Sequence, residues 1–198
     1  TLAVDGATDI TGDFTLTGAA ALNDTLTVTK AATMSSTLAV DGATDITGDF
    51  TLTGAAALND TLTVTKAATM SSTLAVDGAT DITGDFTLTG AAALNDTLTV
   101  TKAATMSSTL AVDGATDITG DFTLTGAAAL NDTLTVTKAA TLSSTLGVSG
   151  ATDITGDVTI TGDLTLTGST DITGDFTLTG AAALNDTLTV TKAATLSS

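Results

Sequence analysis

Residues Thr1–Ser36 read TLAVDG ATDITG DFTLTG AAALND TLTVTK AATMSS when they are written in groups of six. The fourth residue of each hexad is large and apolar, and the second is usually apolar. Positions one, three and five are Thr, Ala, Asp, Asn or Ser, and position six is Gly, Asp, Lys or Ser. Because side chains alternate along a strand, the second and fourth residues share one face. The stretch therefore predicts short strands, each ending at a corner.

This 36-residue block repeats along the chain. Further blocks begin at Thr37, Thr73 and Thr109, a half block covers 145–162, and a last block covers 163–198. A short strand and a tight turn repeated in tandem predict a β-solenoid, in which each coil packs on the next. We expect the residues from 1 to 198 to form one continuous array. Because the sequence starts and stops inside the pattern, we also expect it to be a segment of something longer.

The half block indicates the length of one coil. Its three hexads, TLGVSG ATDITG DVTITG, are followed by a restart of the pattern, so three hexads of a full block are missing. Three hexads therefore make one turn, which predicts an all-β, three-sided parallel β-solenoid with 18 residues per coil. In this register Phe14 stacks on Ala32, and such alternation of large and small residues fills an interior without voids. We call the junction between the half block and the last block, at residues 162 and 163, the break. The residue of the half block that corresponds to Phe14 is Val158, and it meets Phe176 in the next coil.

A second arrangement satisfies the same periodicity. Three identical chains would intertwine as a homotrimeric β-helix, each supplying one side of every layer. Three Phe14 side chains would then converge on the axis, whereas a single chain places Leu, Thr and Phe in the same coil. Mixed layers pack more evenly than layers of three identical rings, which favours the single chain.

The amino-acid composition argues against several classes of function. The chain has five Lys and 22 acidic residues, all of them Asp, and its net charge is −17. That charge repels phosphates and anionic lipid surfaces, so we expect no nucleic-acid partner and no membrane insertion. The sequence contains no His, Cys, Tyr or Glu, so general acid–base catalysis would depend on Asp alone. We therefore expect no enzymatic activity and no resident cofactor.

Carboxylates at the break form the candidate cation site. The segment DGATDITGD (Asp5–Asp13) resembles calcium-binding Asp/Gly repeats, since hard cations take several carboxylate and carbonyl oxygens. Its spacing does not match an EF-hand loop. At the break, the 18-residue register stacks Asp153 on Asp171 and Asp157 on Asp175, each pair about 5 Å apart. These four residues are the predicted weak cation site, with Ca²⁺ as the candidate ion.

The TLAVDGATDITG-type hexads resemble the shafts of bacteriophage tail fibres and the repeats of bacterial surface fibres and adhesins, over the whole chain. The resemblance implies an elongated, non-enzymatic shaft, located outside the cell on a cell surface or virion. Open ends of such a stack pair readily with another chain, so we expect self-association, either head-to-tail or as a homotrimer.

Two other protein classes share parts of the pattern. The chain is similar to the left-handed β-helix acyltransferases in its hexapeptide repeat. It departs from them at Leu2, Phe14 and Leu26, where those enzymes usually keep a small residue, and it lacks their catalytic His. The Thr-x-Thr pairs resemble the flat Thr arrays of solenoid ice-binding proteins, because Thr15 stacks on Thr33. Binding of ice or a crystal surface is therefore the alternative to a structural fibre.

Overall fold

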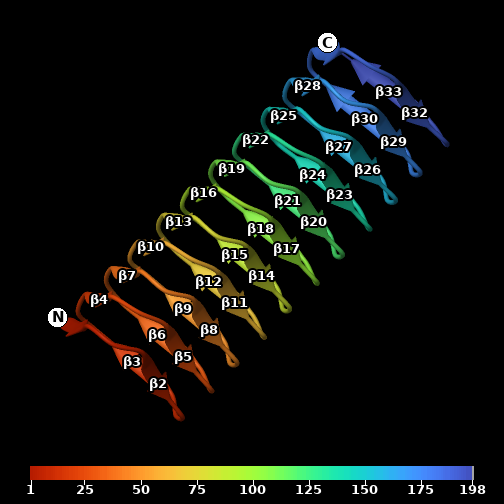
Figure 1. The fold of residues 1–198 in the computed structure, drawn as a ribbon. Coiled ribbons are helices and arrows are strands. Elements are labelled where there is room, and N and C mark those ends of the chain that lie inside the picture. The colour runs from red at the N-terminus through yellow and green to blue at the C-terminus, as the bar shows by residue number, and fades with distance from the viewer. Residues whose placement is uncertain (198) are drawn as a thin grey trace.

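The computed structural model describes residues 1–197, which form a straight stack of eleven coils with the two termini at opposite ends (Figure 1). Each coil contributes one short strand to each of three parallel, 11-stranded sheets. The strand covers the second to fourth residues of a hexad, where Val, Ile, Leu, Phe and Thr favour extended backbone. The remaining residues of the hexad form the corner to the next sheet.

Sheet A contains β1 (Leu2–Val4), β4 (Ala20–Leu22), β7 (Leu38–Val40), β10 (Ala56–Leu58), β13 (Leu74–Val76), β16 (Ala92–Leu94), β19 (Leu110–Val112), β22 (Ala128–Leu130), β25 (Leu146–Val148), β28 (Leu164–Leu166) and β31 (Ala182–Leu184). Sheet B contains β2 (Thr8–Ile10), β5 (Leu26–Val28), β8 (Thr44–Ile46), β11 (Leu62–Val64), β14 (Thr80–Ile82), β17 (Leu98–Val100), β20 (Thr116–Ile118), β23 (Leu134–Val136), β26 (Thr152–Ile154), β29 (Thr170–Ile172) and β32 (Leu188–Val190). Sheet C contains β3 (Phe14–Leu16), β6 (Ala32–Met34), β9 (Phe50–Leu52), β12 (Ala68–Met70), β15 (Phe86–Leu88), β18 (Ala104–Met106), β21 (Phe122–Leu124), β24 (Ala140–Leu142), β27 (Val158–Ile160), β30 (Phe176–Thr179) and β33 (Ala194–Ser197).

Strands pair in parallel with a constant step of 18 residues, as the sequence predicts. Phe14 pairs with Ala32, and the N–H of Thr80 donates to the carbonyl of Thr97 in the following coil at 2.9 Å. Because the neighbours along the axis belong to the same chain, one chain forms all three sides. The three-sided parallel solenoid is therefore confirmed, and the intertwined trimer is not the arrangement of this structure.

The register continues without interruption through the break. Leu146 pairs with Leu164, and Val158 pairs with Phe176. Two coils of the same type are neighbours here, whereas elsewhere the two halves of the 36-residue block alternate. The replacement of Phe by Val158 keeps two rings from stacking in adjacent coils, as the sequence predicts.

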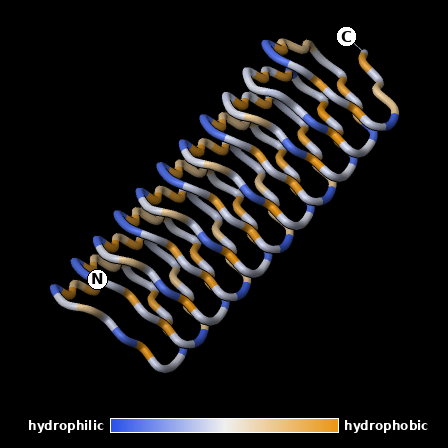
Figure 2. Tube along the Cα trace, turned by 45° about the vertical axis from the view of Figure 1, so that its right-hand side comes forward, coloured by the Kyte–Doolittle hydropathy of each residue, from blue (hydrophilic) through white to orange (hydrophobic). Residues whose placement is uncertain are grey.

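An apolar column fills the interior. The second and fourth residues of the hexads are buried in all coils except the two at the ends, whereas the third residue is largely exposed. Figure 2 shows the resulting bands, with hydrophobic strand residues and hydrophilic corners recurring at the same place in successive coils. Full burial of a Leu or Phe side chain contributes about 1.5–3 kcal/mol, so the regular interior supplies the main stabilisation.

Glycine at the corners is explained by close approach between coils. Among the described residues no glycine has a positive φ, so the turn itself does not require glycine. A Cβ on Gly48 would instead overlap the backbone carbonyl group of Lys30 in the preceding coil. At the corner between sheets B and C, Lys30 therefore fits in one coil, whereas the equivalent position in the following coil, Gly48, has no room for a side chain.

The structure has no helix among residues 1–197 that is both long and apolar enough to cross a bilayer.

Candidate functional site

The structure brings the four acidic residues at the break into two axial pairs. Asp153 and Asp171 are direct neighbours on β26 and β29, and both are exposed. One carboxylate oxygen of Asp157 accepts a hydrogen bond from the backbone N–H of Asp175 at 2.9 Å. Asp175 in turn accepts from the N–H of Ala193 at 3.0 Å. The second pair thus already satisfies backbone donors at a corner.

The same corner bond recurs once in each of the four regular 36-residue blocks. Asp13 accepts from the N–H of Ala31 at 3.3 Å, and Asp49 accepts from the N–H of Ala67 at 3.2 Å. Within residues 1–197 no group of three or more His, Cys, Asp or Glu side chains is placed to hold a metal ion. A cation at the break would therefore have Asp153 and Asp171 as its two free carboxylates, and this site stays a prediction.

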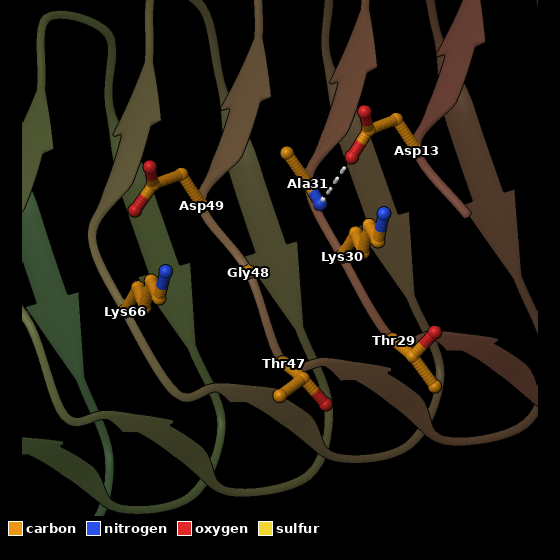
Figure 3. Close-up of a pocket in the computed structure, with 8 residues that line it drawn as sticks. All are labelled: Asp13, Thr29, Lys30, Ala31, Thr47, Gly48, Asp49 and Lys66. Carbon is orange, nitrogen blue, oxygen red and sulfur yellow. Dashed lines mark hydrogen bonds between the residues drawn. The ribbon is translucent and has the colours of Figure 1, made fainter. Parts of the chain in front are cut away.

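A groove runs along the corner between sheets B and C (Figure 3). Lys30 and Lys66 lie on this corner two coils apart, with Gly48 between them, and Asp13 and Asp49 lie on one side. The groove has a volume of about 300 Å³, and equivalent grooves recur at the next two Lys positions. It offers ammonium, carboxylate and hydroxyl groups, and the sequence supplies no His or Cys to act as base or nucleophile. The groove therefore presents groups of both charges along this corner.

The corner between sheets A and B carries a ladder of amide–carboxylate bonds. The side-chain amide of Asn23 donates to Asp5 at 3.0 Å, and the bond recurs in the later blocks up to Asn131 and Asp113. The ladder stops at the break, where Ser149 and Thr167 replace the acidic residues. The 18-residue register predicts these neighbours, but not that they form hydrogen bonds.

Sheet C presents an unbroken row of hydroxyl groups. The middle residue of each of its strands is Thr, and each of these residues pairs with the next along the axis. The row consists of Thr15, Thr33, Thr51, Thr69, Thr87, Thr105, Thr123, Thr141, Thr159, Thr177 and Thr195. A parallel row lies two residues further along the chain, beyond the end of most strands, and alternates Thr17-type and Ser35-type residues except at the break, where Thr161 and Thr179 are neighbours. The sequence predicts this ladder, and the structure places it on one face.

Six threonine hydroxyls of sheet B point into the apolar interior of the solenoid. The Oγ1 atoms of Thr8, Thr44, Thr80, Thr116, Thr152 and Thr170 are buried and make no hydrogen bond with any described residue. Their positions follow from the alternation of the hexad ATDITG, in which Thr occupies the inward second position. Their lack of partners depends on the packing around them, so the sequence does not reveal it.

In comparisons with protein families, curated proteins and solved structures, nothing matched this chain. What is established is the architecture: a tandem-repeat β-solenoid with 18-residue coils.

Proposed function

We propose that this chain is a stiff structural segment of an extracellular fibre or filament, on a virion or a cell surface. The observation that carries the proposal is the continuity of the three sheets, each of which runs through all eleven coils in one register. Bending such a rod strains backbone hydrogen bonds on at least one sheet, since each coil is bonded to its neighbours on all three sides. A spacer needs this property, and it needs no binding pocket.

Electron microscopy of tandem copies tests the proposal. A longer chain that joins several copies in the 36-residue register should appear as a straight rod, and each added copy should lengthen it by about 50 Å, from eleven strand spacings. A matched control joins the same copies through long flexible Gly/Ser linkers, so that the sheets of one copy do not continue into the next. The control should bend at the linkers. Compact or beaded particles from the uninterrupted tandem chain would contradict the proposal.

Self-association through the end coils follows from the same architecture. When the 198 residues are prepared alone, Leu196 and Leu184 on the last coil are 64% and 39% exposed, and Phe14 on the first coil is only half-buried. The last coil has the sequence type of residues 19–36, and the first coil has that of residues 1–18. Inside the chain, each coil of the 19–36 type pairs with a following coil of the 1–18 type, as in the pairing of Ala32 with Phe50. An end-to-end contact between two copies would repeat this junction.

Sedimentation velocity tests this contact. The unchanged chain should form species that grow with concentration, because head-to-tail contacts do not close into a ring. Leu196→Lys places a charge in the exposed end column and should leave the chain monomeric. If both chains stay monomeric at all concentrations, the ends are not an interface.

Binding of ice or another crystal surface is the second candidate, and the hydroxyl rows on sheet C favour it. They form a regular array with spacings of about 4.8 Å along the axis and about 6.6 Å along the strands. An assay of ice recrystallisation with Thr87→Lys on sheet C tests it, with Thr99→Lys on sheet B as the matched control. Loss of inhibition in Thr87→Lys alone would support surface binding. The absence of inhibition in the unchanged chain would refute it.

A further inference from the structure

Two corner glycines of the first coil lie beside open space. A Cβ built on Gly6 or on Gly12 would meet no atom within 4 Å. At the same corners of the next coil of this type, glycine is tightly enclosed by the coil before it. A Cβ on Gly42 would lie 2.7 Å from the backbone nitrogen of Thr25, and a Cβ on Gly48 would overlap a backbone carbonyl group. The first coil thus keeps glycine where the chain itself leaves room for a side chain.

The enclosed glycine at the corner between sheets B and C is also bonded to the preceding coil. The N–H of Gly48 donates to the carbonyl of Lys30 at 3.0 Å, and equivalent bonds are donated by Gly84, Gly120 and Gly156. The glycine in the first coil that corresponds to Gly48 is Gly12, which has no earlier coil to bond. The N-terminal face of the stack therefore presents both the donor and the space that this contact needs.

The last coil carries the other half of the same contact. Residues 181–198 have the same sequence as residues 127–144, a coil of the 19–36 type that is followed inside the chain by a coil starting at Thr145. Residues 1–18 have the same sequence as residues 37–54. Lys192 is the residue of the last coil that corresponds to Lys30, and its carbonyl lies at the C-terminal end of the stack. The two ends of one chain are therefore complementary.

We propose that the N-terminal face of the first coil docks the last coil of a second copy of this chain, and that Gly6 and Gly12 control the docking. In the docked pair the N–H of Gly12 donates to the carbonyl of the partner's Lys192, as Gly48 does to Lys30 inside the chain. Because a Cβ at either glycine would overlap the backbone of the docked coil, these corners must be glycine. All copies then point in the same direction along the filament. This inference rests on the head-to-tail contact of the proposed function and names the residues that decide it.

Sedimentation velocity of the double variant Gly6→Ala, Gly12→Ala tests the proposal. In the isolated chain the two methyl groups enter open space, and neither glycine has a positive φ, so the urea midpoint should not fall below that of the unchanged chain. Association should weaken by about tenfold or more, because the methyl groups meet the backbone of the docked coil. The matched control is Lys192→Ala, which removes the ammonium group and keeps the backbone carbonyl. This control should associate as the unchanged chain does.

Equal association of the double variant and the unchanged chain would overturn this inference and leave the head-to-tail contact standing. If the unchanged chain stays monomeric, the contact and this inference both fail, whereas the fibre proposal is judged separately by the rods of the tandem chain. A loss of association in Lys192→Ala as large as in the double variant would show that charge joins the ends instead of close backbone approach. That result would also overturn the inference.

Discussion

Replacing the interior Thr80 by Val should stabilise the solenoid. The Thr80 side chain is 0% exposed, and its Oγ1 has no hydrogen-bond partner among the described residues. An unsatisfied buried hydroxyl destabilises the folded state by about 1–3 kcal/mol, and Val has nearly the same shape as Thr. We therefore expect the free energy of unfolding to rise by about 1–2 kcal/mol, the lower part of that range.

The effect should accumulate along the chain. Thr44, Thr80 and Thr116 are separated from each other by an intervening Leu, at about 9.6 Å per step, which is far enough for stability changes to add. The triple Thr→Val variant should gain about three times the single change. Urea unfolding followed by circular dichroism measures it through the midpoint, provided that the slope m is unchanged.

The control is Thr83→Val, at an exposed position just beyond the same strand. Surface changes of this kind usually alter stability by less than about 0.5 kcal/mol. A midpoint for Thr80→Val below that of Thr83→Val, at equal m, would show that the Thr80 hydroxyl is bonded in the folded state. The account of the interior as a dry column with unsatisfied hydroxyls would then be wrong.

Three further predictions concern the corners, the interior and the cation site. Gly84→Ala should destabilise by about 1–3 kcal/mol because its Cβ overlaps the Lys66 carbonyl group, whereas Gly147→Ala, inside a strand with free space, should stabilise by about 0.5–1 kcal/mol; urea midpoints of opposite sign check this. Ile82→Asp buries an unpaired charge and should lower stability by about 3–5 kcal/mol, and a melting temperature equal to that of the unchanged chain would contradict the inward assignment. Calcium should raise the melting temperature of the unchanged chain but not of Asp153→Asn, and equal shifts in both would remove Asp153 from the site.

The register of the fold could be predicted because the repeat pattern of the sequence indicates the length of one coil. Alternation at a period of two identifies the inward residues, and the three missing hexads before Asp163 identify the coil length. The replacement of Phe by Val158 supports that length independently, since only an 18-residue step brings it onto Phe176. These signals are local or strictly periodic, so they can be read without coordinates.

Features that depend on the distance between coils could not be predicted. The glycine at corners such as Gly48 is required by the backbone of the preceding coil, and no glycine among the described residues has a positive φ. Asp13 accepts a hydrogen bond from the N–H of Ala31, a contact that the sequence pattern does not specify. The register places Asp153 on Asp171 correctly, yet it does not reveal that Asp157 is engaged with backbone.

The distance between two labels along the axis tests the single-chain solenoid most directly. The chain contains no Cys, so Thr15→Cys and Thr177→Cys on the outer face of sheet C give two unique sites for spin labels, nine coils apart. With one strand spacing per coil, pulsed electron paramagnetic resonance should give a distance of about 43 Å between them. In an intertwined trimer each turn climbs three layers, and the same two residues of one chain would be about 130 Å apart. A distance distribution without a peak near 43 Å would contradict the account.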